Sequence, residues 1–299
     1  MRTAFINQLV EEARKNDHIF LLVGDLGYNV VESFANKFPE RYLNVGICEQ
    51  NMVGIAGGLA MNGWIVYCYS IGNFPTLRCM EQIRNDVLYY HSNVRIVSVG
   101  AGYAYGSQGV SHHATEDVGM MRTMPGLVVC CPSDPIETKM LVSLSVHHDG
   151  PMYIRLGKAG EKVFHPKPVS NYKLGQLLPI IDNNNNTVVL VGGAILSRAM
   201  EQILRNSLPY DVYTIPVVKP IDKEQLIHLT LTYSNIIVLE ENQASAGMGS
   251  AVIEVLNDAY SYGQLSHFPK VKRIAIQDEF LSVAGSQSYL QDLAGLNLK

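Results

Sequence analysis

The segment that decides the fold is YLNVGICEQNMVGIAGGLAMNG, residues 42–63. Its first residues form a strand-like run, and its second half has the composition of a helix that begins near Glu49. Gly54, Gly57 and Gly58 lie inside this helix, where each costs up to about 1 kcal/mol relative to alanine. Such glycines usually let another backbone or a ligand come close. The segment therefore predicts a strand, a loop and a closely approached helix.

Short apolar runs that alternate with helical segments extend this pattern through the first half of the chain. The runs lie at residues 18–24, 64–70, 94–99, 127–131 and 152–156. Near-continuous apolar strands that alternate with helices are typical of a parallel sheet covered on both faces. We therefore expect a first α/β domain over residues 1–160.

The alternation lapses at residues 161–184 and then restarts. This stretch holds prolines, lysines and an asparagine run, which is the composition of a linker that ends in a turn. Beyond it we expect further strands and helices, among them one continuous strand over residues 211–218. A second, smaller domain is therefore expected at residues 185–299. The predicted fold class is α/β, with two doubly wound, mainly parallel-sheet domains.

The composition excludes several classes of protein. The chain has 299 residues, a net charge of −4 and 47% hydrophobic residues, so it can bury full cores but has no basic field for nucleic acid. Its five cysteines are odd in number and form no CxxC pair, which argues against a disulfide framework and a zinc ribbon. Residues 50–77 are uncharged, but glycines, asparagines and a proline interrupt them, so we expect no membrane span. Because the N-terminus has no signal-peptide core, we expect a cytoplasmic protein.

Glu49 is the first candidate for chemistry. It follows a strand of the expected sheet, and ligands of open parallel sheets gather at the carboxyl ends of the strands. An acidic side chain in the first turn of a helix also has a purely structural role, because it interacts favourably with the helix dipole. Spacing alone favours that structural role.

The next segment contains two repeats with a spacing of three residues. Phe74, Leu77 and Met80 share one face of a helix or turn, and such a stripe is more often core than a cofactor pocket. A second set with the same spacing is expected to form ion pairs on the surface, namely Arg78, Glu81 and Arg84.

A glycine-rich loop at residues 100–113 ends in His112 and His113. Two adjacent histidines in a flexible loop suit acid–base chemistry near neutral pH, and they equally suit solvated loop positions. Gly-x-Gly after a strand is part of the dinucleotide-binding motif, but here the third glycine comes one place late and no helix pattern starts at once. A dinucleotide site would give the chain affinity for NAD, and we expect none.

Taken together, these segments resemble the signature of transketolase-family enzymes. The resemblance rests on residues 45–52 with the Gly-Gly-Leu-Ala that follows, the 74–84 helix, the 106–112 loop, Pro132-Ser133-Asp134 and the 152–155 strand. The first domain is similar to the family's pyrimidine-binding domain. Residues 187–299 are similar to its C-terminal domain, including Lys219-Pro220-Ile221-Asp222 and Glu240-Glu241-Asn242.

The resemblance implies thiamine diphosphate as the cofactor. Glu49 matches the glutamate that binds the pyrimidine ring nitrogen and favours the reactive tautomer of the cofactor, a role that requires shelter from water. Phe74 matches the aromatic residue that stacks on the pyrimidine, and His112 matches a histidine near the reacting centre. Three more positions match residues around the cofactor, namely Asp25, Leu77 and Met80.

The resemblance also implies a set of substrate-binding residues. Arg155 and Arg2 match arginines that hold the anionic end of the substrate. At four other positions the chain departs from ordinary transketolases: Gln108 replaces an aspartate, His113 a glutamine, Asn29 a serine and Gly100 a histidine. Two phosphate contacts are thereby lost. The reaction implied is transfer of a two-carbon ketol unit from a ketose donor, through an intermediate bound to thiamine diphosphate, to an unusual aldehyde acceptor such as a nucleotide-linked sugar.

One part of a complete transketolase has no match in this sequence. The family's first domain grips the diphosphate and a divalent metal through a Gly-Asp-Gly motif and a later asparagine, whereas this chain has only Gly24-Asp25-Leu26. We therefore expect one subunit of a split enzyme, which holds no metal itself and is inactive alone. A separate partner subunit is expected to bring the diphosphate site with Mg²⁺ or a similar ion, in a heterotetramer built around a homodimer of this chain.

Two alternatives stay open. Within thiamine enzymes, the chain suits a pyruvate-using synthase of the deoxyxylulose-phosphate-synthase type or the β subunit of a 2-oxo-acid dehydrogenase. In another class, it is a non-catalytic partner subunit with a vestigial cofactor surface. The joint presence of Glu49, Phe74 and His112 speaks against that second alternative.

Overall fold

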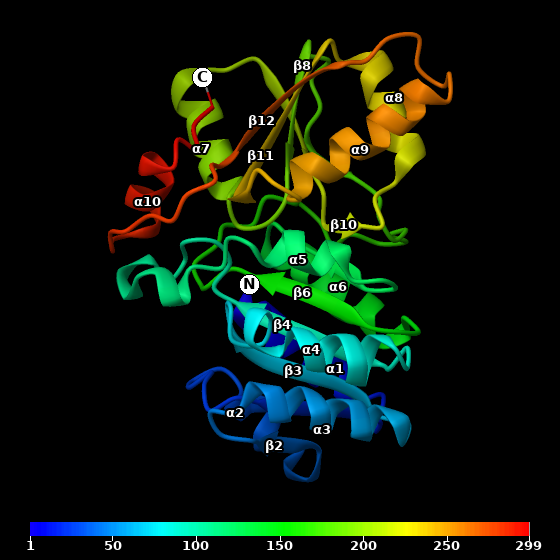
Figure 1. Ribbon diagram of the computed structural model, residues 1–299, viewed down its shortest axis with the longest axis vertical. Helices are drawn as coiled ribbons and strands as arrows, with labels where there is room; N and C mark the ends of the chain where they lie inside the picture. The colour runs from blue at the N-terminus through cyan, green and yellow to red at the C-terminus, as the bar shows by residue number, and fades with distance from the viewer. Residues whose placement is uncertain (299) are drawn as a thin grey trace.

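Two sheets, each flanked by helices, make up the computed structural model, which describes residues 1–298 (Figure 1). The first sheet has seven strands in the order β10-β5-β6-β4-β3-β1-β2, and the second has five in the order β12-β11-β8-β9-β7. Neighbouring strands of the first sheet are parallel except β10 and β5, and those of the second are parallel except β7 and β9. The predicted α/β class with two mainly parallel sheets is therefore confirmed.

The strands of the two sheets alternate with helices along the chain. The first sheet contains β1 (Ile19–Val23), β2 (Tyr42–Asn44), β3 (Ile65–Ile71), β4 (Val94–Val99), β5 (Val128–Cys130), β6 (Met152–Leu156) and β10 (Val217–Lys219). The second contains β7 (Leu178–Ile181), β8 (Thr187–Val191), β9 (Tyr210–Thr214), β11 (Asn235–Gln243) and β12 (Lys270–Ile276).

The helices are short to medium in length. They are α1 (Arg2–Ala13), α2 (Glu32–Ala35), α3 (Glu49–Met61), α4 (Met80–Gln82), α5 (Asp117–Thr123), α6 (Pro135–His147), α7 (Leu196–Asn206), α8 (Lys223–Thr232), α9 (Met248–Ser261) and α10 (Gln287–Leu293). Tighter 3-10 turns lie at Pro39–Arg41, Leu77–Cys79, Gly106–Gln108 and Val110–His112. None of the helices in residues 1–298 is long and apolar enough to cross a membrane.

The strand expected over residues 211–218 is in fact two strands in two different sheets. β9 belongs to the second sheet, whereas β10 lies antiparallel to β5 at the edge of the first. Pro216 lies between them and has no N–H with which to continue a ladder, so the chain leaves one sheet and joins the other. The second half of the chain is therefore tied to the first sheet by main-chain pairing.

The second sheet also begins earlier than expected. β7 lies inside the stretch that the sequence assigns to a linker, and it pairs antiparallel with β9 at the edge of the sheet. Its Pro179 explains the error, because proline is unfavourable inside a sheet but tolerated on an edge strand. The sheet of the second domain therefore starts at Leu178 and not after residue 184.

Alternate strand residues face opposite sides of the first sheet, as strand geometry requires. Leu21 packs in the apolar cluster that includes Phe5 of α1 and Leu141 of α6, whereas its neighbour Leu22 packs with Met52 of α3 on the other face. All five side chains are fully buried, and burying one such side chain contributes about 1.5–3 kcal/mol. This packing anchors α3 firmly on the sheet.

The close approach predicted for α3 is present at one of its glycines. A Cβ at Gly57 would lie 2.6 Å from the main-chain oxygen of Asp86, which belongs to a π-helical turn at Ile83–Leu88. At Gly54 the nearest atom would be 3.8 Å away, and at Gly58 nothing in the described chain lies within 4 Å. A larger residue at position 57 would push α3 and this turn apart.

Candidate active site

Glu49 is the first residue of α3, and only 1% of its surface is exposed. The hydroxyl of Ser70, near the end of β3, donates a hydrogen bond to its carboxylate at 3.1 Å. Gly24, directly after β1, packs against the carboxylate, since a Cβ there would lie 3.3 Å from Oε1. Two parallel strands and a helix N-terminus thus converge on one buried acid, whose negative charge the helix dipole favours.

Arg78 makes the shortest polar contact to this acid. Its guanidinium donates to Glu49 Oε2 at 2.5 Å, and its Cζ lies 4.6 Å from the centroid of the Phe74 ring. The expected surface ion pair between Arg78 and Glu81 is therefore wrong. A carboxylate removed from water is costly unless it is paired, whereas an exposed pair contributes only about 0–1 kcal/mol, so the buried partner is preferred.

The rings of Phe74 and His112 meet beside this ion pair. Their centroids are 5.2 Å apart with an interplanar angle of 72°, which is an edge-to-face contact. Ser111 Oγ lies 3.0 Å from His112 Nδ1 and helps to orient the imidazole. Partial burial lowers the pKa of His112, so its ring is neutral at physiological pH and can accept a proton. The structure therefore brings Glu49, Phe74 and His112 to one place.

Tyr105 forms the next wall of the site. Its ring centroid is 6.5 Å from that of His112, and it fills the space that a side chain at Gly100 would need, since a Cβ there would lie 2.2 Å from the ring. The Lys158 ammonium nitrogen lies 4.9 Å from the Tyr105 ring centroid. Burial raises the pKa of Tyr105, and the adjacent Arg2 guanidinium opposes this rise. Two cations therefore lie near this wall.

Sequence reasoning missed both Tyr105 and Lys158. Lys158 lies two residues after Leu156, the last residue of β6, and ligand-binding residues are expected at the carboxyl end of a parallel strand. That signal was present in the sequence. Nothing in the local sequence, by contrast, shows that the Tyr105 ring folds back over Gly100.

Arg155 is buried and contacts groups of its own chain, and its expected role in substrate binding stays a prediction. It lies within β6 and is buried, and it donates to Asp117 at 2.8 Å and to the main-chain oxygens of Ala114 and Glu241 at 2.8 and 3.0 Å. The hydroxyl of Tyr153 donates to the same Asp117 carboxylate at 2.5 Å. These contacts join the first domain to β11 of the second, and they use donors that a substrate would need.

The remaining predicted residues are dispersed. His113 is buried, its ring packs edge-on against Tyr103, and its Nε2 has no hydrogen-bond partner within residues 1–298; its expected contact with substrate stays a prediction. Asp25 is exposed and accepts a hydrogen bond from the Asn44 amide at 3.0 Å, next to Gly24. Three others are exposed or half-buried, and their roles stay predictions: Gln108, Asn29 and Leu77.

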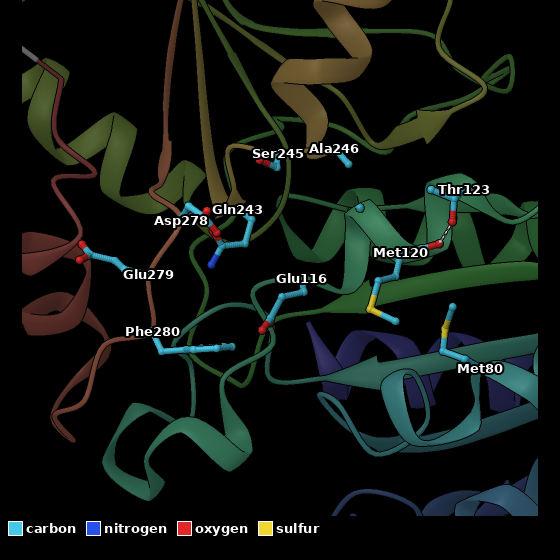
Figure 2. Close-up of a pocket in the computed structure, with 11 residues that line it drawn as sticks. Met80, Glu116, Met120, Thr123, Gln243, Ser245, Ala246, Asp278, Glu279 and Phe280 are labelled. Atoms are coloured by element: carbon cyan, nitrogen blue, oxygen red, sulfur yellow. Dashed lines mark hydrogen bonds between the residues drawn. The ribbon is translucent and has the colours of Figure 1, made fainter.

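Met80 lines a separate cavity of about 500 Å³ between α5, the loop after β11 and residues 278–280 (Figure 2). Its side chain points toward that of Met120, with Glu116 and Phe280 on other walls. Glu49 is not among the residues that line this cavity. The role of Met80 at the cofactor stays a prediction.

The residues around Glu49 fit the pyrimidine end of thiamine diphosphate. That ring needs a carboxylate sheltered from water and an aromatic face beside it, and Glu49 and Phe74 supply these two groups. Arg78, whose guanidinium is also planar and hydrogen-bonding, contacts both of them. Within residues 1–298, no three His, Cys, Asp or Glu side chains are grouped so that they could hold a metal ion.

Comparisons with known proteins find one family in both halves of the chain. The family model of the transketolase pyrimidine-binding domain matches residues 1–160, and that of the transketolase C-terminal domain matches residues 180–299. A subunit of the apulose-4-phosphate transketolase of Phocaeicola vulgatus is 30% identical over 86% of this chain and 83% of its own length. A subunit of the 6-deoxy-6-sulfo-D-fructose transketolase of Clostridium sp. is 29% identical over 100% of this chain and 91% of its own length. A solved structure of a split-gene transketolase, an inactive β4 tetramer, matches with 31% identity and a TM-score of 0.83, covering 99% of this chain and 93% of that one.

Proposed function

This chain belongs to the transketolase family, and from that premise we propose that it is the pyrimidine-binding subunit of a two-chain, thiamine diphosphate-dependent ketol transferase. A separate partner subunit supplies the diphosphate site and the divalent metal. The observation that carries the proposal is the buried Glu49 carboxylate near the Phe74 face, at the carboxyl ends of parallel strands.

The residues of this chain have distinct parts in the proposed reaction. Thiamine diphosphate, when bound, supplies a carbanion-stabilising centre for the transfer of a two-carbon unit. Glu49 holds a proton at the pyrimidine nitrogen, and its burial excludes the water that would compete for it. The Phe74 ring orients the pyrimidine by stacking. The neutral His112 imidazole, which contacts Phe74, accepts a proton from a substrate hydroxyl.

The proposed donor is a ketose with an anionic end. Lys158 and Arg2 both lie near Tyr105, and cations of this kind bind phosphate or sulfonate groups. The names of the two similar proteins specify a phosphorylated sugar and a sulfonated sugar, which supports this class of substrate. The nucleotide-linked acceptor expected from the sequence stays a prediction.

Replacing Lys158 with alanine is expected to raise the KM for such a donor about tenfold and to leave kcat unchanged, because a hydrogen bond to a charged group contributes about 1.5 kcal/mol. Steady-state kinetics of the assembled enzyme measure both quantities. Lys162→Ala, at an exposed lysine in the same loop, is the matched control and should leave KM unchanged. An unchanged KM for the Lys158 variant would remove this residue from the substrate site.

We propose further that two copies of this chain form the centre of a heterotetramer with two partner subunits. The similar split-gene transketolase structure contains four β chains and is described as inactive. That description supports a chain that associates with itself but lacks part of its active site. It also agrees with the expectation that activity needs the partner.

The proposed function is tested by reconstitution. The chain is expressed alone and together with the polypeptide that carries the family's diphosphate-binding domain, and both preparations receive thiamine diphosphate and Mg²⁺. Turnover of a ketose donor is expected only when both chains are present. Product analysis with a ketose and with pyruvate separates ketol transfer from the pyruvate-using alternatives. Turnover by the chain alone, or by the pair with pyruvate only, would contradict the proposal.

A further inference from the structure

Arg78 makes two contacts at once, and both use groups of the proposed pyrimidine site. Its guanidinium lies 2.5 Å from the Glu49 carboxylate, and its Cζ lies 4.6 Å from the centroid of the Phe74 ring. A planar heterocycle bound at this place needs the same carboxylate and the same ring face. We propose that Arg78 is an internal substitute for the pyrimidine, which occupies this half-site in the free chain and leaves it when the cofactor binds. The inference rests on the proposed function of Glu49 and Phe74.

The burial of Glu49 explains why the free chain needs such a group. The carboxylate is 1% exposed, and the hydroxyl that donates to it from Ser70 is neutral. Removing a carboxylate from water is costly unless an opposite charge pairs with it. Arg78 supplies that charge from within the chain, so the buried charge of Glu49 stays paired while no cofactor is bound.

The position of Arg78 allows it to leave. Its side chain is 41% exposed, so the guanidinium tip enters the site while much of the stem stays in contact with solvent. The residue lies in the 3-10 turn Leu77–Cys79, between Phe74 and α4. Exposed side chains change rotamer within picoseconds to nanoseconds, so withdrawal of the guanidinium needs no rearrangement of the sheet or of α3.

A substitute of this kind lowers the apparent affinity for the cofactor. When the binding-competent state is only partly populated, the apparent dissociation constant rises by the inverse of that fraction. Arg78 thereby sets how readily the empty enzyme takes up thiamine diphosphate. Removing the guanidinium should therefore tighten cofactor binding, whereas removing an ordinary cofactor-binding residue would weaken it.

The test compares Arg78→Met with the wild type in the complex assembled with the partner subunit. Methionine keeps much of the length of the side chain but removes its charge and hydrogen bonds. In calorimetric titration with thiamine diphosphate and Mg²⁺, the Kd is expected to fall about 3- to 10-fold. Arg84→Met is the matched control, because Arg84 is exposed and donates a hydrogen bond to its neighbour Asn85. The Kd of this control variant for the cofactor should equal that of the wild type. An unchanged or higher Kd for Arg78→Met overturns the inference.

Further variants separate the failure of this inference from the failure of the proposed function. Arg78→Lys keeps the charge but not the planar group, so a smaller fall in Kd is expected; no fall overturns the inference even where the methionine variant does not assemble. Glu49→Gln and Phe74→Ala should both weaken cofactor binding. If these two bind like the wild type, the pyrimidine site lies elsewhere and the proposed function fails. If they bind weakly while both Arg78 variants resemble the wild type, only the substitute is refuted.

A second measurement needs no cofactor and uses the isolated full chain. Thermal unfolding is followed for Glu49→Gln, Arg78→Met and the double variant. Because the two side chains form one pair, the double variant is expected to lower Tm by less than the sum of the two single shifts. Additive shifts would show that the pair is not formed in the free chain, which also overturns the inference.

Discussion

Replacing Glu49 with glutamine is expected to lower the turnover of the assembled enzyme about a thousandfold, because acid–base catalysis by one positioned side chain contributes about 10²–10⁴-fold. The amide has nearly the same shape and still accepts the hydrogen bond from Ser70. It cannot share a proton with the pyrimidine nitrogen, however, so the loss falls on the chemical step. The measurement is kcat with a ketose donor at saturating thiamine diphosphate.

The control for this experiment is Glu81→Gln, which removes an exposed carboxylate from the neighbouring helix α4. It should leave turnover unchanged. Circular dichroism should show that both variants fold like the wild type. A Glu49→Gln enzyme that keeps full turnover would contradict the role proposed for Glu49 and would favour a non-catalytic partner subunit.

Replacing Asp117 with alanine is expected to destabilise the chain by about 3–5 kcal/mol, which is the usual effect of removing one partner of a buried ion pair. The change leaves the Arg155 guanidinium buried without its carboxylate and removes the acceptor of the Tyr153 hydroxyl. The side chains of Arg155 and Asp117 are 1% and 0% exposed, so water cannot replace the lost partner. Urea unfolding measures the loss as a lower midpoint.

Two further variants calibrate this result. Glu254→Ala breaks the pair with Arg122, in which Glu254 is 62% exposed, and an exposed pair should contribute only about 0–1 kcal/mol. The double variant Asp117→Leu with Arg155→Met should recover much of the stability, since apolar replacement of a whole buried pair is often neutral. If Asp117→Ala costs no more than Glu254→Ala, the buried pair does not contribute the stability expected of it.

The sequence predicted most of the fold because strand and helix periodicity are local properties. The helix predicted from residues 42–63 begins at Glu49. The Asp86 backbone approaches Gly57 closely, as expected for a glycine that is kept inside a helix despite its cost in stability. The errors occurred at prolines. Pro179 lies in an edge strand and Pro216 lies between strands of different sheets, and only the assembled sheets show which strand is an edge.

The candidate site was predicted in part. The order of motifs, and not any single residue, led us to expect Glu49, Phe74 and His112 in one site. The three residues lie together in the structure. The roles of the expected substrate-binding residues stay predictions. Arg155 is buried at the domain junction, and Lys158, whose place after β6 was a signal that sequence reasoning did not use, lies beside Tyr105.

The sequence by itself determined the alternation of strands and helices, the place of Glu49 at a helix start after a strand, and the family, because each depends on residues near one another in the chain or on the order of motifs. Only the tertiary structure decided which charges meet: Arg78 with Glu49, and Arg155 with Asp117. Such pairs form where residues distant in sequence lose water together, and the free energy of removing charge from water depends on the whole packed environment.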